Sequence, residues 1–246
     1  MISFSFILLF LLSLFSGFSN AIAGGGSAFT LPFLLYLGLD SAEANCTNRI
    51  AILFQTIWAL KIYKNKGEIR KGLSWSESVW VLPGAILGAF MVFHIDTFWF
   101  KKILAVVLLW IILEPIFPKL KFSSTLNPSS FLFKIGLFLV GFYGGFIQMG
   151  VGFLILGLLR FFLNQNLIQL NHHKLFLVLI LNVPAFLMSL GTGKNLWSLG
   201  LLMSLGNILG AWAAVHWSLQ KGEAWTRRIL NAILLVFAFL LFSGIE

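Results

Sequence analysis

Apolar segments follow one another along the whole chain and are separated by short polar connections. The first of them contains no charged residue at all. The segments cover about 1–39, 46–63, 77–95, 99–117, 131–163, 173–190, 196–218 and 226–245. Apolar runs of this length are typical of membrane-spanning helices. The pattern therefore predicts an all-α polytopic membrane protein.

The first segment is too long for one crossing and carries a glycine break. Residues 1–39 would form about 58 Å of helix, nearly twice the roughly 30 Å of a bilayer's hydrocarbon core. Gly24, Gly25 and Gly26 interrupt it, and each glycine destabilises a helix by about 1 kcal/mol relative to alanine. We expect a helical hairpin broken at these glycines, whose arms either cross the membrane or form a re-entrant pair.

The second half of the chain repeats the first. The glycine stretch at 17–32 recurs 124 positions later at 141–153, and similar motifs downstream recur at nearly the same offset. Such a repeat indicates an internal duplication. We expect residues 1–118 and 131–246 to form two membrane repeats joined by a cytoplasmic linker at 119–130. Each repeat would be a glycine-broken helical hairpin followed by three transmembrane helices.

Charge in the connections predicts the orientation. Basic residues cluster at 61–71, which places that connection in the cytoplasm. Because a hairpin plus three crossings gives an odd number of passages, the two repeats are expected to be inverted. The loops at 40–48, 94–100 and 191–197 then lie outside together. The lysines at 101–102 fall on the outer side as well, against the rule.

Composition excludes several other classes of protein. Only 10% of residues are charged and 59% are hydrophobic, whereas a soluble domain carries about 25% charged residues. The net charge of +9 lies mainly in connections, so we interpret it as an orientation signal and not as nucleic-acid binding. Cys46 is the single cysteine, and the sequence has no metal-binding motif, so neither a disulfide nor a cofactor is expected. Residues 1–23 lack the positive start of a secretory signal and belong to the repeated pattern, so we expect them to be retained.

The broken helices supply candidate binding residues. A helix that begins inside a membrane presents free N–H groups and a positive dipole end, which together can bind an anion. Polar and cationic pairs open the second element of each half, and they either complete an anion pocket or anchor helix ends at the interface. For the glycines spaced four apart at 84 and 88 and at 206 and 210, we favour close helix packing. The predicted substrate-binding residues are Asn20, Gly24, Gly25, Gly26, Thr30, Asn48, Arg49, Gln148, Gly150, Gly152, His173, Lys174 and Asn182.

These motifs resemble the TauE/SafE family of membrane permeases, also called the TSUP family. The resemblance rests on 17–32 with Asn48–Arg49 downstream, and on 141–153 with Lys174 and Asn182 downstream, and it extends over nearly the whole chain. It implies a permease of duplicated origin in the cytoplasmic membrane. The implied solutes are small sulfur-containing anions such as sulfite, sulfonates or thiosulfate.

Three residues depart from the family's pattern at the predicted solute site. Gln148 stands in place of a glycine, Val151 in place of a threonine, and His173 where threonine is common. We expect this second break to determine selectivity. The sequence thus predicts a transporter whose partners are a small anionic solute and the lipid bilayer, and it leaves open whether two chains form a homodimer. The alternatives are a structural or assembly subunit of a membrane complex, or an intramembrane enzyme, for which the sequence contains no catalytic motif.

Overall fold

The computed structural model describes residues 2–22, 24–65, 75–113, 130–163 and 165–242, so the predicted linker at 119–130 lies almost entirely outside it. These residues form helices and short connections, with no strand among them, which confirms the predicted all-α class. The helices are α1 (Ile2–Ile22), α2 (Ser27–Tyr36), α3 (Ser41–Asn65), α4 (Trp75–Ser78), α5 (Val81–Val92), α6 (Thr97–Leu113), α7 (Phe131–Phe146), α8 (Val151–Phe162), α9 (Leu167–Leu190) and α10 (Trp197–Phe242).

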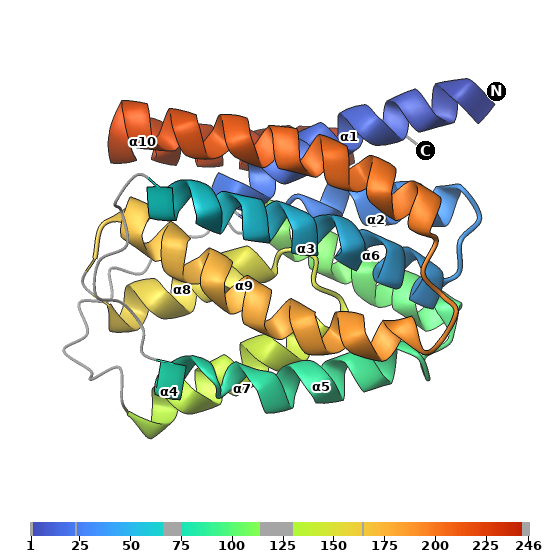
Figure 1. Cartoon of the computed structure of the whole chain (residues 1–246), viewed down its shortest axis with the longest axis horizontal. Helices are drawn as coiled ribbons and strands as arrows, with labels where there is room; N and C mark the ends of the chain where they lie inside the picture. The colour runs from blue at the N-terminus through green and yellow to red at the C-terminus, as the bar shows by residue number, and fades with distance from the viewer. Residues whose placement is uncertain (1, 23, 66–74, 114–129, 164, 243–246) are drawn as a thin grey trace.

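The helices are stacked in layers. Figure 1 shows α1 and α10 along one side of the molecule, α5 and α7 along the opposite side, and α3 and α9 between them. The central helices contact each other and also touch both outer pairs. Polar side chains on α3 and α9 are therefore enclosed by apolar helices.

Helix lengths separate spanning helices from half-helices. Among the described residues, four helical stretches are long and apolar enough to cross a membrane: 4–22, 75–92, 167–190 and 197–221. By contrast, α2 has 10 residues and α8 has 12. Their lengths of about 15 and 18 Å fall well short of a hydrocarbon core of about 30 Å. The second arm of each hairpin therefore cannot cross the membrane by itself.

The helix α3 has 25 residues, about 37 Å at 1.5 Å per residue, yet hydropathy does not select it as a span. The reason is its buried face, which carries Asn45, Asn48, Arg49 and Gln55. These side chains contact other helices instead of lipid. Helix length alone therefore identifies α3 as a candidate membrane span, whereas hydropathy does not.

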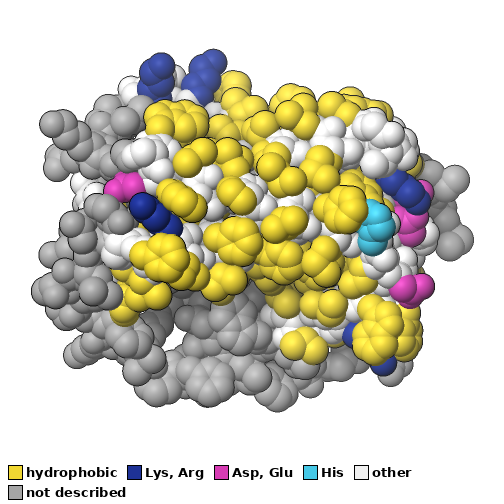
Figure 2. Space-filling view, turned by 90° about the horizontal axis from the view of Figure 1, so that it is seen from below, with side chains coloured by type: hydrophobic (Ala, Val, Ile, Leu, Met, Phe, Trp, Pro, Cys, Tyr) yellow, Lys and Arg dark blue, Asp and Glu magenta, His cyan; other side chains and the backbone are white. Residues whose placement is uncertain are grey.

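The exposed surface is apolar in its middle. Figure 2 shows hydrophobic side chains covering the centre of one face, while most charged side chains lie toward its two ends. Large hydrophobic side chains are exposed on several helices, among them Phe4, Phe90, Leu187 and Trp212. Soluble monomers rarely expose apolar areas of this extent. The surface is that of a membrane protein whose apolar belt faces lipid.

Glycines let two pairs of helices touch backbone to backbone. A methyl group added at Gly210 of α10 would lie 2.0 Å from the carbonyl oxygen of Leu14 on α1. A methyl group added at Gly88 of α5 would likewise lie 2.0 Å from the carbonyl oxygen of Phe142 on α7. Close packing, the interpretation favoured for these glycines, is confirmed. The first helix of each predicted half thus contacts a helix of the other half.

One predicted boundary differs. The segments at 196–218 and 226–245 were expected to be separate helices, but the structure assigns residues 197–242 to the single helix α10. The intervening residues 219–225 include Leu, Gln, Lys, Glu and Ala, which favour helix, together with one glycine and no proline. Backbone hydrogen bonding can therefore continue through a stretch whose polarity alone indicates a connection. Side chains of α10 are described as far as residue 221.

Candidate functional site

The two glycine breaks meet inside the molecule. A methyl group added at Gly24, between α1 and α2, would lie 2.2 Å from the Cα atom of Gly152 in the first turn of α8. Gly24 has φ +105, a conformation that glycine adopts without steric strain. The bare backbones of both breaks are therefore in direct contact, although about half the chain separates them in sequence.

The second break contains a strained residue. Gln148 has φ 65 and is the non-glycine residue with positive φ among those that the structure describes. The left-handed region costs a residue with a side chain roughly 1–2 kcal/mol. Such strain persists where the surrounding structure holds it and is common at functional sites.

Arg49 is buried beneath the end of α7, with 1% of its surface exposed. Its Nε donates to Asn45 Oδ1 at 2.7 Å and its Nη1 to Asn182 Oδ1 at 3.3 Å. Its Nη2 donates to the carbonyl oxygens of Gly144, at 3.2 Å, and Gly145. Carbonyls at a helix C-terminus carry the negative end of the helix dipole. They stabilise the guanidinium without any carboxylate.

Lys174 is hydrogen-bonded to the C-terminal end of α1, as Arg49 is to that of α7. Its Nζ donates to the carbonyl oxygens of Asn20 at 2.8 Å and Ala21 at 3.0 Å, and to Asn171 Oδ1 at 3.0 Å. The side chain is fully buried, so it does not snorkel to the interface. Arg49 and Lys174 thus each donate to the C-terminal carbonyl groups of the helix that precedes a break in the other half. Both predicted cations contact helix C-termini, whereas an anion pocket would need them beside the N-termini of α2 and α8.

Two pairs of side-chain amides lead from these helix ends toward the breaks. In one pair, the Gly26 N–H donates to Asn20 Oδ1 at 2.7 Å, and Asn20 Nδ2 donates to Gln55 Oε1 at 3.3 Å. In the other, Gln148 Nε2 donates to Asn182 Oδ1 at 3.0 Å, and Asn182 Nδ2 donates to the Arg49 carbonyl oxygen at 3.1 Å. Each pair joins a break to a central helix.

A small cavity lies between the breaks. Its lining side chains are all uncharged. The space accommodates on the order of one water molecule, which is less than a sulfite-sized anion needs. The lining residues are Asn20, Gly24, Ser27, Ile52, Gln55, Thr56, Gln148, Val151, Gly152, Leu175 and Val178.

Of the predicted binding residues, Asn20, Gly24, Gln148 and Gly152 line this cavity. Three more, Gly26, Arg49 and Asn182, are joined to Asn20 or Gln148 through the two amide pairs. The remaining six also lie outside the lining, although Lys174 and Asn48 are hydrogen-bonded to lining residues. These six are Gly25, Thr30, Asn48, Gly150, His173 and Lys174.

These six have local structural roles. Thr30 Oγ1 donates to Asn48 Oδ1 at 2.8 Å, and Asn48 Nδ2 donates to Ser27 Oγ at 3.2 Å, which ties α2 to α3. Gly150, with φ 71, forms the N-cap of α8. The other contacts are those of Gly25 beside the Phe153 ring, His173 against the His172 ring, and Lys174 on the end of α1.

Sequence reasoning missed three polar cavity residues, Ser27, Gln55 and Thr56. Gln55 carried a usable signal, because it follows Asn48 by seven residues and so lies on the same helical face. A polar face continuing two turns into an apolar segment indicates an internal site. Among the described residues, no group of three or more His, Cys, Asp or Glu side chains is arranged to hold a metal ion.

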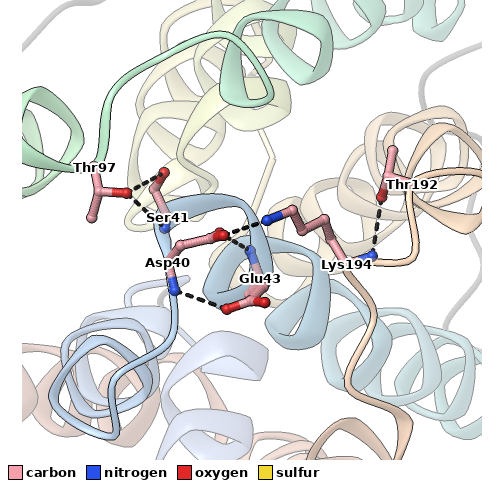
Figure 3. Close-up of polar contacts among 6 residues, drawn as sticks. All are labelled: Asp40, Ser41, Glu43, Thr97, Thr192 and Lys194. Carbon is pink, nitrogen blue, oxygen red and sulfur yellow. Dashed lines mark hydrogen bonds and ion pairs between the residues drawn. The ribbon is translucent and has the colours of Figure 1, made fainter.

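An ion pair joins the two halves at one end of the molecule. Figure 3 shows Lys194 Nζ against Asp40 Oδ2, with Asp40 also paired to Glu43: Glu43 N donates to Asp40 Oδ1 at 2.8 Å and Asp40 N donates to Glu43 Oε2 at 3.0 Å. This reciprocal pair is a capping box at the start of α3. Partial burial alone would raise the pKa of Asp40, but Lys194 and the backbone N–H groups hold that pKa below its ordinary value.

Beside this ion pair, Thr97 Oγ1 donates to Ser41 Oγ at 3.3 Å and accepts from Ser41 N at 3.4 Å (Figure 3). The segments predicted as loops at 40–48, 94–100 and 191–197 therefore lie together, as the predicted orientation requires, although α3 already begins at Ser41 and α6 at Thr97. The part of that prediction that concerns a shared side is confirmed. Whether this side faces outward stays a prediction.

Comparison with known proteins places the chain among transporters. It is 30% identical over 241 residues to a "Probable membrane transporter protein ORF9" of Sinorhizobium sp, covering 96% of this chain and 91% of that protein. It is 29% identical over 238 residues to a "Probable membrane transporter protein" of Haemophilus influenzae, covering 95% and 91%. The "Probable membrane transporter protein YfcA" of Escherichia coli K12 is 25% identical over 226 residues, covering 90% and 84%.

No solved structure matches the chain. The family match is nearly complete, since the model of the family described as "Sulfite exporter TauE/SafE" matches residues 9–241. That range includes both glycine breaks, both buried cations and the cavity between them. The chain therefore belongs to the sulfite exporter TauE/SafE family of membrane transporters.

Proposed function

We propose that this transporter moves small sulfur-containing anions, such as sulfite, sulfonates or thiosulfate, across the cytoplasmic membrane. The observation that carries the proposal is the contact between Gly24 and Gly152, which brings the two breaks to one cavity. Two half-helices, α2 and α8, begin there. The description of the matching family names sulfite, which agrees with this class of solute.

The electrostatics of the cavity favour an anion. The N-terminal ends of α2 and α8 bring the positive ends of helix dipoles to the cavity, although most of their first N–H groups are hydrogen-bonded within the protein. No carboxylate lines the cavity to repel a negative charge. Arg49 and Lys174 are held close behind the lining residues and add positive potential, although their donors are engaged by protein carbonyls and amides.

Reciprocal contacts support two inverted repeats within 1–118 and 131–246. Arg49 in the first half closes α7 in the second, and Lys174 in the second half closes α1 in the first. The helix pairs packed through glycines, α1 with α10 and α7 with α5, likewise each join a helix of one half to a helix of the other. Inverted-topology repeats related by a pseudo-twofold axis produce such reciprocal contacts between the halves, and their solute sites lie at the repeat interface near the membrane centre.

Transport requires the halves to move. The cavity is smaller than the proposed solutes, and the Asp40–Lys194 ion pair links the halves at one end. We therefore assign the described conformation to a closed state that opens by movement of one half against the other. A negative cell interior favours anion export by about 2.3 kcal/mol per charge per 100 mV, a driving force that can support export without a coupling ion.

The proposal is tested with purified protein in two assays. Solute-dependent thermal unfolding should show stabilisation by sulfite, thiosulfate or a sulfonate and none by chloride, because a ligand that binds only the native state stabilises it. Proteoliposomes loaded with the stabilising anion should release it faster than protein-free liposomes loaded with the same anion. Absence of both effects for every sulfur anion would overturn the proposal and leave a structural subunit or a transporter of other solutes.

A further inference from the structure

We infer that the site binds its oxyanion with one proton attached, as in hydrogen sulfite, and that Gln148 accepts that proton in a hydrogen bond. This inference rests on the proposed function, because it concerns the chemical form of the solute at the same cavity. It is carried by the direction in which two glutamine amides, Gln148 and Gln55, are held.

The orientation of Gln148 is fixed by Arg49. A guanidinium only donates, so Asn182 must turn Oδ1 toward Arg49 Nη1, and its Nδ2 then donates to the Arg49 carbonyl oxygen. Asn182 Oδ1 can accept only from the nitrogen of Gln148, which leaves Gln148 Oε1 free. That oxygen is buried and has no hydrogen-bond partner among the described residues.

The orientation of Gln55 is fixed from the other break. The Gly26 N–H only donates, so Asn20 turns Oδ1 toward it and Nδ2 toward Gln55. Gln55 Oε1 is then occupied, and its amide N–H groups are the donors left for the cavity. The two halves therefore offer complementary groups: an acceptor from Gln148 and a donor from Gln55.

This pair of groups discriminates between charge states of an oxyanion. A fully ionised dianion has only acceptor oxygens, and one of them would face the Gln148 carbonyl oxygen without a proton between them. A monoprotonated oxyanion donates its O–H to Gln148 Oε1 while its other oxygens accept from Gln55 Nε2. It also carries a single negative charge, which a cavity lined by uncharged side chains stabilises more readily.

Two solutes of equal charge isolate the role of the proton. Hydrogen sulfite and methanesulfonate are both monoanions of similar shape, but only hydrogen sulfite has an O–H. Initial rates of uptake into proteoliposomes should give a KM about 5- to 150-fold lower for hydrogen sulfite, the range expected when a buried acceptor is left unpaired. Above the second pKa of sulfurous acid, the KM calculated for total sulfite should rise by about tenfold per pH unit.

The methanesulfonate measurements also control for titration of the protein. Titratable groups near the breaks are Tyr143 on α7, Arg49 on α3, and His173 and Lys174 on α9. Their titration would change the KM of both solutes, whereas protonation of the solute changes only that of sulfite. The KM of methanesulfonate should therefore stay constant over the same pH range.

Two matched variants separate the acceptor from the donor. Gln148→Met removes the acceptor and should abolish the preference for hydrogen sulfite over methanesulfonate. Gln55→Met removes the donor and should weaken both solutes equally, with the preference retained. If Gln148→Met unfolds, Gln148→Gly tests the same point, because glycine adopts the φ of 65 at this position without strain.

The outcomes distinguish this inference from the proposed function. Transport of sulfite with a KM that does not change with pH, or equal KM values for the two monoanions, would overturn the inference that the solute binds with a proton attached. Either result would leave the proposed anion transport intact. A preference that survives in Gln148→Met would overturn the role of Gln148. No transport of any sulfur anion would overturn both proposals.

Discussion

The contact between the two breaks leads to a quantitative prediction for Gly24→Ala. The added methyl group would lie 2.2 Å from Gly152 Cα and less than 3 Å from its N and C atoms. No flexible side chain can move aside, so one half-helix must shift. The chain offers a matched control in Gly38→Ala, because Gly38 has a similar φ of +93 but no atom within 4 Å of an added methyl group.

The difference between the two variants measures the contact. Both introduce a side chain at a left-handed residue, which costs about 1–2 kcal/mol. Both also reduce the freedom of the unfolded chain, an effect of about 0.4–1 kcal/mol that cancels in the comparison. Only Gly24→Ala adds overpacking, typically about 1–3 kcal/mol. Its free energy of unfolding should therefore fall by about 1–3 kcal/mol more than that of Gly38→Ala.

The free energy of unfolding can be measured by denaturant titration in mixed micelles, with anion release from proteoliposomes measured on the same preparations. Gly24→Ala should also slow release, because its methyl group separates the N-termini of α2 and α8, whereas Gly38→Ala should leave release unchanged. Gly157→Ala, in open space on α8, should leave release unchanged and raise the free energy of unfolding by about 1 kcal/mol, because alanine favours helix over glycine. Equal destabilisation by Gly24→Ala and Gly38→Ala would refute the contact between the breaks.

Three further substitutions test other contacts. Lys174→Met leaves three buried acceptors unpaired and should lower the free energy of unfolding by about 3 kcal/mol or more. Its control, Lys61→Met on the exposed surface of α3, should change that free energy by about 1 kcal/mol or less. Similar values for the two variants in a denaturant titration would refute the role of Lys174. Asp40→Asn retains the cap but loses the ion pair with Lys194, which should lower the free energy of unfolding by about 1 kcal/mol or less. Because the pKa of Asp40 is lowered, this difference from wild type should be present at neutral pH and vanish as the pH falls below about 4. A difference that persists at the lower pH would contradict the ion pair. Asn207→Leu should raise the unfolding temperature, because neither polar atom of this buried side chain has a partner among the described residues. A lower unfolding temperature would contradict this expectation.

Much of the architecture could be read from the order of residues. Membrane helices follow from the length of apolar runs, because a bilayer leaves a backbone no hydrogen-bond partners except its own. The glycine breaks follow from the helix propensity of Gly24–Gly26, and the short α2 follows from the break and the next polar residues. The extent of α10 was less accessible, since a polar connection made of good helix formers gives no signal of where a helix stops.

The candidate site depended on tertiary contacts. The sequence singled out Arg49 and Lys174 as cations near the breaks, but whether they meet a solute or a carbonyl depends on which helix end lies within reach of their side chains. The structure brings the C-terminal end of α7 to Arg49 and that of α1 to Lys174, from the opposite half in each case. A local pattern cannot specify a partner more than ninety residues away.

By itself, then, the sequence determined that this is a helical membrane protein with two glycine breaks and polar residues on α3 and α9. Local rules suffice for these features, because hydrophobic length, glycine propensity and helical periodicity each act over a few neighbouring residues. Only the tertiary structure decided that Gly24 touches Gly152, and that Gln148 and Gln55 line one cavity with their amides held in opposite directions by their hydrogen-bond partners. The direction of an amide depends on its partners, and those partners lie on other helices.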